Sequence, residues 1–173
     1  MSEHSAAVDQ GIGGETDQVD VAVIGDGNTF KGPVVATPIN IDVDVDLNVD
    51  LNVDFVGNGE SVRQEIDQDI NQDTDQTAGA VIGGGNTFEG PVVITPTNID
   101  VDVGYNVGAN FAVVSGDGDV DQEIDQSLIQ DTDQRTEVVI GEETTLEGPL
   151  LVDATNINID RAGSIAISEI FYV

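Results

Sequence analysis

The sequence contains no cysteine and no tryptophan, and it has one histidine and one lysine in 173 residues. Without cysteine there can be no disulfide, no thiolate nucleophile and no zinc–thiolate centre. The histidine, His4, lies near the N-terminus and the lysine is Lys31, so a catalytic triad or a lysine-based site has almost no residues to draw on. We therefore expect a protein that is not an enzyme.

Positive charge is equally scarce, with 4 Lys and Arg against 34 Asp and Glu and a formal net charge of −30. Such a chain repels nucleic-acid phosphates and anionic membranes, so neither is expected as a partner. No apolar run is long enough for a membrane span, and the N-terminus shows no signal peptide. The self-repulsion favours an extracellular or virion-surface location, or a high-salt medium, where cations offset it.

Aromatic residues make up only 4% of the chain, so the core must be built from Val, Ile, Leu and Ala. A tandem repeat organises these residues. The segments Ala22–Asp44 and Ala80–Asp102 are 58 positions apart and differ at four of 23 positions, and a weaker third copy covers Val138–Asp160. We expect a flexible N-terminal arm at residues 1–7 and one repeat domain at 8–173, with units of about 8–65, 66–123 and 124–173.

Within each repeat, the clearest strand signal runs from Ile39 to Phe55, where aliphatic residues alternate strictly with Asp and Asn. This period of two predicts a strand with one face in the core and one in solvent. Hydropathy assigns the aliphatic face to the core and the acidic face to water. Because 17 residues is long for one flat strand, the run is expected to bend around corners.

A second alternating segment runs from Gln64 to Gln76, with Ile, Gln and Thr on one parity and mainly Asp on the other. Here the acidic side is expected to face water. The buried glutamines then need hydrogen-bond partners, and copies stacked in register can supply them to each other as ladders. The alternative is a half-exposed strand whose glutamines bind water.

Between these segments, Gly25, Gly27, Asn28 and the Gly32-Pro33 pair are turn residues. Alternation, turns and repeats together predict an all-β fold of three tandem repeats. A β-solenoid, or stacked-sheet structure, is the favoured architecture. A β-sandwich and a pseudo-threefold β-prism are the alternatives.

Aligned carboxylates are the candidate metal ligands, because equivalent strands about 4.8 Å apart would bring them together and hard cations such as Ca²⁺ bind oxygen ligands. No EF-hand loop is present. The candidates lie on two segments and their repeats: Asp42, Asp44, Asp46, Asp100, Asp102, Asp67, Asp69, Asp73 and Asp75. Ca²⁺ is the one cofactor that the sequence suggests, and a solvated acidic face without a specific ion is the alternative.

These features favour a structural, self-assembling protein: a filament, matrix, surface-layer or virion component. Strand edges can template further strands, and the apolar run from Ile165 to Val173 can add to a neighbouring sheet, so we expect self-association. A Ca²⁺-dependent carbohydrate-binding or adhesive module is the alternative function. Its weakness is the lack of aromatic stacking platforms.

Overall fold

The structure is a computed structural model that describes residues 3–173, and these residues form twelve β-strands and no helix. Two kinds of strand are long. The 22-residue strands are β1 (Glu3–Ile24), β5 (Ser61–Ile82) and β9 (Asp119–Ile140), and the 18-residue strands are β4 (Ile39–Val56), β8 (Thr97–Val114) and β12 (Thr155–Tyr172).

Two kinds of strand are short and lie between the long ones. They are β2 (Thr29–Phe30), β6 (Thr87–Phe88) and β10 (Thr145–Leu146), followed by β3 (Val34–Ala36), β7 (Val92–Ile94) and β11 (Leu150–Val152). Each repeat is therefore one rung with the order long, short, short, long.

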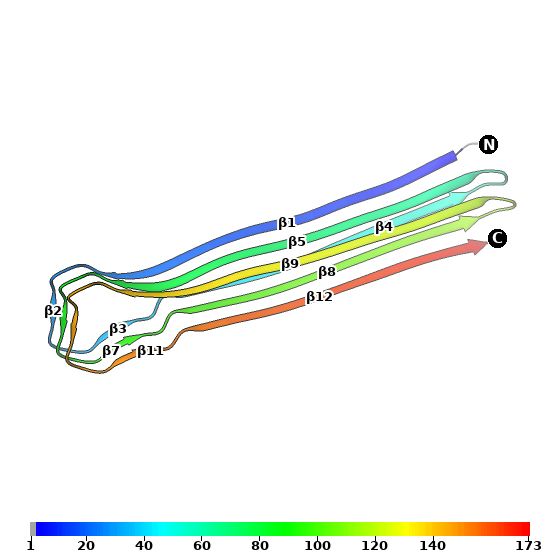
Figure 1. Cartoon of the computed structure of the whole chain (residues 1–173). Helices are drawn as coiled ribbons and strands as arrows, with labels where there is room; N and C mark the ends of the chain where they lie inside the picture. The colour runs from blue at the N-terminus through cyan, green and yellow to red at the C-terminus, as the bar shows by residue number, and fades with distance from the viewer. Residues whose placement is uncertain (1–2) are drawn as a thin grey trace.

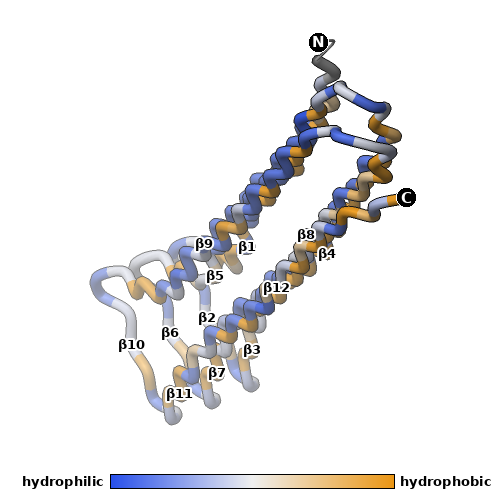
Figure 2. Tube along the Cα trace, turned by 90° about the vertical axis from the view of Figure 1, so that its right-hand side faces the viewer, coloured by the Kyte–Doolittle hydropathy of each residue, from blue (hydrophilic) through white to orange (hydrophobic). Residues whose placement is uncertain are grey.

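Equivalent strands of successive rungs pair in parallel and form four three-stranded sheets. Every pairing joins residues 58 apart, as in Ile12 with Ile70 and Asp67 with Asp125. The chain is thus a β-solenoid of three rungs, as the repeat predicted, and the sandwich and prism alternatives are not what forms. The two long sheets face each other along a rod, and the short sheets close one end (Figures 1 and 2).

The long strands do not bend around corners as the sequence analysis expected. β4 is a single strand of 18 residues, which at about 3.4 Å per residue spans roughly 60 Å. The corners lie in the short-strand region instead. There Gly27 and Gly85 have φ values of 71° and 68°, whereas the third rung places Glu143 at the equivalent position with φ 61°.

Apolar clusters close both ends of the rod. At the short-strand end, Phe88, Val92 and Ile94 are fully buried, and the rings of Phe30 and Phe88 stack with centroids 4.9 Å apart. At the opposite end, Val56, Val62 and Val114 form a smaller cluster. In-register stacking explains both clusters, because each rung places an apolar side chain beside an apolar equivalent in the next rung.

The glutamine strands behave as predicted: β5 buries Gln64, Gln68, Gln72 and Gln76, and its acids point to solvent. The glutamines form ladders between rungs. Gln134 donates to Gln76 at 2.9 Å, and Gln76 donates to Gln18 at 3.1 Å. The alternative of water-bound glutamines is therefore wrong for the central rung.

The other long sheet has the opposite sidedness from the one predicted. In β4 the apolar residues face outward, with Val45 68% and Phe55 75% exposed, while Asn48 and Asp50 are buried. β8 keeps the same parity: Asn98, Asp100, Asp102, Asn106 and Asn110 are all 0% exposed. The prediction that these strands turn their aliphatic side chains to the core was wrong.

Amide hydrogen bonding explains how a polar interior is stable here. Asn40 donates to Asn98 and Asn98 to Asn156, each at 3.0 Å, so the asparagines form ladders of their own. Inward amides also reach backbone carbonyls of the opposite sheet: Asn110 donates to Glu123 at 3.0 Å, and Gln64 donates to Phe111 at 3.0 Å. Buried amides that are paired in this way avoid most of the cost of desolvation.

The first and last described strands, β1 and β12, are edge strands of their sheets. Residues 3–7 of the segment predicted as a flexible arm belong to β1, and residues 1–2 of that segment lie outside the described residues. Most of the apolar run from Ile165 to Val173 lies in β12, an edge strand of its sheet. The described residues contain no helix with the length and hydrophobicity needed to cross a bilayer.

Candidate functional site

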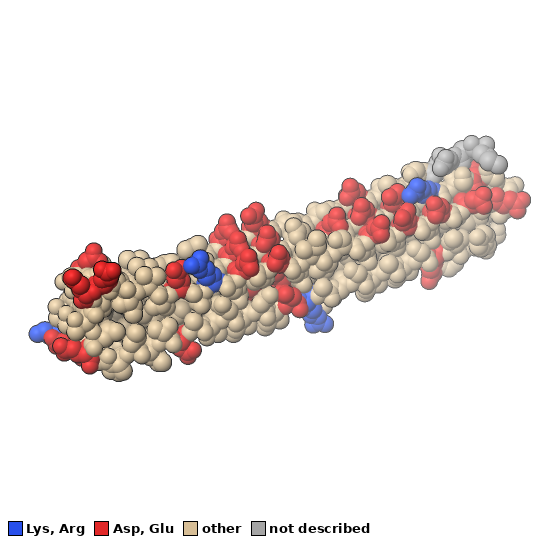
Figure 3. Space-filling model, viewed as in Figure 1, with Lys and Arg blue, Asp and Glu red and all other residues tan. Residues whose placement is uncertain are grey.

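The outer face of the β1–β5–β9 sheet carries aligned rows of carboxylates (Figure 3). The predicted ligands Asp67, Asp69, Asp73 and Asp75 all lie there and are exposed. Asp67 pairs with Asp9 and Asp125 in the neighbouring strands. Partial desolvation in this crowded row, followed by repulsion from Asp69, Asp9 and Asp125, raises the pKa of Asp67.

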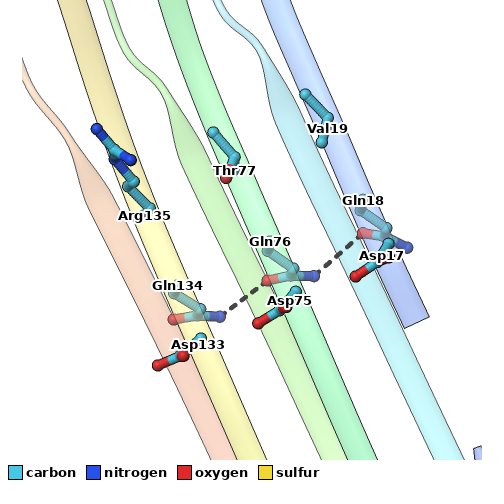
Figure 4. Close-up of a pocket in the computed structure, with 9 residues that line it drawn as sticks. All are labelled: Asp17, Gln18, Val19, Asp75, Gln76, Thr77, Asp133, Gln134 and Arg135. Carbon is cyan, nitrogen blue, oxygen red and sulfur yellow. Dashed lines mark hydrogen bonds between the residues drawn. The ribbon is translucent and has the colours of Figure 1, made fainter. Parts of the chain in front are cut away.

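A shallow groove of about 560 Å³ crosses this face where Asp17, Asp75 and Asp133 line up beside the glutamine ladder (Figure 4). Partial desolvation, Asp133 and Asp17 raise the pKa of Asp75. Arg135 lines the same groove but pairs with Glu137, at 2.8 Å. The groove is open and its acids are exposed, so solvent can hydrate their charges.

The other predicted ligands, Asp42, Asp44, Asp46, Asp100 and Asp102, lie on the inward side of β4 and β8. They stack in register, Asp42 beside Asp100 and Asp44 beside Asp102. Asp160 of β12 extends the second column as the partner of Asp102. The structure thus divides the predicted ligands into an exposed outer set and an interior set, on different sheets.

Within the interior set, Asp100, Asp102 and Asp160 each offer an oxygen within 4.8 Å of the others. Threonines of the opposite sheet supply some hydrogen bonds: the Thr132 hydroxyl donates to Asp100 at 2.6 Å, and the Thr74 hydroxyl donates to Asp42 at 3.1 Å. Neither oxygen of Asp102 has a hydrogen-bond partner among the described residues.

Burial makes these carboxyls hard to ionise. Desolvation, and then the charges of Asp100 and Asp44, raise the pKa of Asp102 to about 7. Desolvation also raises the pKa of Asp100, which the Thr132 hydrogen bond partly opposes. The pKa of Asp44 is raised by desolvation and by Asp42, Asp46 and Asp100. The cluster therefore favours a bound positive species, either protons or a cation.

A third feature is the apolar face, which we define as the outward side of β4, β8 and β12. It is the face that hydropathy had assigned to the core. Exposed apolar residues follow its whole length in β4: Ile39, Ile41, Val43, Val45, Leu47, Val49, Leu51, Val53 and Phe55. In register beside them lie aliphatic residues of β8, together with Tyr105 and Phe111, and then Ile157, Ile159, Ile165 and Ile167 of β12.

The third rung interrupts the apolar face at two points. Arg161 and Glu169 stand where β8 has Val103 and Phe111. The Arg161 guanidinium lies 5.9 Å from the centre of the Tyr105 ring, a cation–π contact on the outside of the rod. Arg161 therefore points away from the interior carboxylates, although Asp160 is its neighbour in sequence.

Sequence reasoning missed Asp160, Thr132 and the apolar face. Asp160 was available from the 58-residue register, since it is the third-rung copy of Asp102. The contact of Thr132 with Asp100 could be predicted only once it was known that the two long sheets face each other. The apolar face could be predicted only by knowing which side of β4 and β8 points outward, and the alternation of residues does not determine that.

Three comparisons with known proteins give no relative: no family model, no curated protein and no solved structure matches this chain. The functional argument therefore depends on the surfaces and clusters described above.

Proposed function

We propose that this protein is a non-enzymatic structural protein that assembles with copies of itself, as a filament, matrix, surface-layer or virion component does. The observation that carries this proposal is the apolar face. Soluble monomers rarely expose a continuous apolar patch larger than a few hundred Å². Here the patch follows the outer side of β4 and β8 and continues onto β12, where only Arg161 and Glu169 interrupt it.

The size of the apolar face suits a second copy of the chain. Three strands about 4.8 Å apart and roughly 60 Å long cover on the order of 800 Å². A standard protein–protein interface buries about that area on each partner. A long, flat sheet of aliphatic side chains is complementary in chemistry to another copy of itself, and two such sheets pack about 10 Å apart.

The charge distribution supports the same partner. The outer acids lie on the β1–β5–β9 sheet, on the opposite side of the rod from the apolar face. In a pair joined through the apolar faces, four sheets about 10 Å apart hold the two acidic faces roughly 30 Å from each other. That distance exceeds the Debye length of about 8 Å at physiological salt, so repulsion between these faces is screened.

The rung ends provide a second contact for assembly. Strands β1 and β4 form one open end of the stack, and β9 and β12 form the other. The glutamine ladder runs in one direction, from Gln134 through Gln76 to Gln18, so an added copy can continue it with the same polarity. Head-to-tail contacts of this kind produce filaments when the rotation between copies does not close into a ring. The apolar run from Ile165 to Val173 lies at the end of the stack that β9 and β12 form.

The test introduces charge on the apolar face. The double variant Val45→Glu/Val49→Glu should be folded by circular dichroism but should lose the dimer that forms through the apolar faces in sedimentation velocity, whereas the wild type should form dimers and larger assemblies that increase with salt. The matched control, Asn71→Glu/Ser127→Glu, adds the same charge to the acidic face, which is the outward side of the β1–β5–β9 sheet. It should assemble like the wild type in 0.5 M NaCl. A monomeric wild type at all concentrations, or equal assembly of Val45→Glu/Val49→Glu, would overturn the proposal.

A further inference from the structure

We infer that Asp100, Asp102 and Asp160 form a binding site for a hard divalent cation, Ca²⁺, inside the solenoid. Their carboxylate oxygens lie within 4.8 Å of one another. Two of the three residues, Asp100 and Asp102, are completely buried, and the third is exposed at the edge of the last rung. This inference does not depend on the assembly proposed above.

The unpaired buried atoms point independently to a cation. Among the described residues, seven buried side-chain atoms lack a hydrogen-bond partner, and six of them are acceptor oxygens of Asp or Asn. They include Oδ1 of Asp100 and both carboxylate oxygens of Asp102. Buried acceptors without a partner are costly, so this interior lacks a hydrogen-bond donor or a cation and not another acceptor.

None of the described residues supplies a positive charge to the cluster. In the described part of the chain, the ion pairs involve only Arg63 and Arg135, with glutamates of the other long sheet. Arg161 contacts the ring of Tyr105 on the outside. The carboxylates of the cluster therefore share a low-dielectric space with Asp42 and Asp44 of the first rung, and no positive side chain of the described residues lies among them. This arrangement favours binding of an external ion.

The ligand set selects the class of ion. It offers only oxygen atoms, which hard cations prefer, and no sulfur or imidazole for zinc or copper. Asp102 has both oxygens free and Asp100 has one. Ca²⁺ accepts six to eight oxygens in irregular geometry, whereas Mg²⁺ demands a near-ideal octahedron. Water at the open end beside the exposed Asp160 can complete the shell and gives the ion a route in.

The outer acidic rows do not carry the same inference. Their carboxylates, such as Asp67 and Asp75, are exposed and none of their oxygens is a buried atom without a partner. A solvated row of acids attracts counterions diffusely, and 0.15 M salt screens that attraction. The outer acids therefore provide matched controls for the interior site.

The test is calorimetric titration of chelator-treated protein with CaCl₂ at pH 7.5 in 0.15 M NaCl. The wild type should bind Ca²⁺ at one site, and Mg²⁺ should bind at least roughly tenfold more weakly. In a separate thermal melt, Ca²⁺ should raise the melting temperature of the wild type. Asp102→Asn and Asp160→Asn should each weaken Ca²⁺ binding at least tenfold. Asp125→Asn, on the acidic face, should bind as the wild type does.

Asp160→Asn keeps the test decisive if Asp102→Asn fails to fold, because Asp160 is exposed at the edge of the rod. Absence of calorimetric binding by the folded wild type would overturn the inference. So would a Ca²⁺ affinity that falls in Asp125→Asn and not in Asp160→Asn, because that result places the ion on the outer rows. Either result leaves the assembly proposal standing, since that proposal is tested on Val45 and Val49.

Discussion

The two long sheets are built from the same kind of alternating strand, yet they face opposite ways. In the β1–β5–β9 sheet the acids point to solvent and Ile66 and Ile70 are buried with the glutamines. In the β4–β8–β12 sheet the asparagines and aspartates point inward and the aliphatic residues point out. Alternation therefore predicts a strand and its two faces, but it does not determine which face is the interior.

The difference has consequences for what each sheet can do. The first sheet presents its acids to solvent and contributes the glutamine ladders, whereas the asparagine ladders belong to the second sheet. The second sheet turns a polar lining, with its carboxylate cluster, to the inside and leaves the apolar face exposed, where we propose that a second copy binds. The predictions below test this contrast, from the largest expected effect to the smallest.

The largest contrast is expected between isoleucines of the two sheets. Ile66→Ala removes a side chain that is 0% exposed, and the cavity should lower the free energy of unfolding by about 2–5 kcal/mol. Ile41→Ala, at a position 57% exposed in β4, should change the free energy of unfolding of the monomer by less than about 0.5 kcal/mol. Urea denaturation of dilute protein measures both, and equal losses would contradict the assigned sidedness.

The interior carboxylates should make the metal-free protein less stable as pH rises. The pKa of Asp102 in the folded state is about 7, above its ordinary value of 3.8, so the folded state binds the proton more tightly. The resulting stability is complete below about pH 4 and is lost as pH rises through 7, with an upper bound of about 4 kcal/mol. Asp44 and Asp100, with raised pKa values, act in the same direction.

Urea midpoints between pH 5 and pH 8 in the presence of a chelator test this dependence. The midpoint should fall across that range, and the fall should be smaller in Asp102→Asn, which cannot ionise there. A midpoint that rises with pH, or an unchanged slope in Asp102→Asn, would argue against a buried, uncompensated carboxyl at this position.

The amide ladder should contribute less than the apolar core. Gln68→Ala removes the bond that Gln68 accepts from Gln126, at 2.6 Å, and the bond that it donates to the Val107 carbonyl, at 3.2 Å. We expect a loss of about 1–3 kcal/mol in the free energy of unfolding. Asn71→Ala, an exposed position of the same strand, serves as the control and should be nearly neutral. A neutral Gln68→Ala would show that the ladder adds no stability.

The smallest effect concerns the third rung. Glu143 has φ 61°, whereas its equivalents Gly27 and Gly85 adopt similar values without a side-chain penalty. Glu143→Gly should therefore raise the free energy of unfolding by up to about 1 kcal/mol. A thermal melt at constant salt measures it, with Glu142→Gly as the control for the charge removed. Destabilisation by Glu143→Gly would contradict the backbone conformation at this corner.

Much of the fold follows from the sequence because stacking copies each rung onto the next. The period fixed the parallel register, and the paired Gln76 and Gln134 predicted the ladder that the structure contains. The sidedness of β4 did not follow, since hydropathy assumes that burial favours the aliphatic face. Here Asn40, Asn98 and Asn156 satisfy one another and the opposite backbone, which makes a polar interior stable.

The candidate cation cluster was predictable only in part. Asp42, Asp44, Asp100 and Asp102 were recognisable as an aligned set, because the register alone brings them together. Their burial was not recognisable, and burial is what separates them from Asp67 and Asp75 on the outer face. The hydrogen bond from Thr132 to Asp100 joins two sheets that face each other, and the sequence does not specify which sheets do so.

The central claim is that β4 turns its aliphatic side chains outward, and thiol labelling tests it most directly because the chain has no cysteine of its own. Two neighbours in β4 are replaced singly, Val49→Cys at a site 56% exposed and Asn48→Cys at a site 1% exposed. With dilute monomeric protein and iodoacetamide, Val49→Cys should react as fast as the unfolded chain. Asn48→Cys should react at least roughly tenfold more slowly, because it must await local opening. Fast labelling of Asn48→Cys with protection of Val49→Cys would contradict the account.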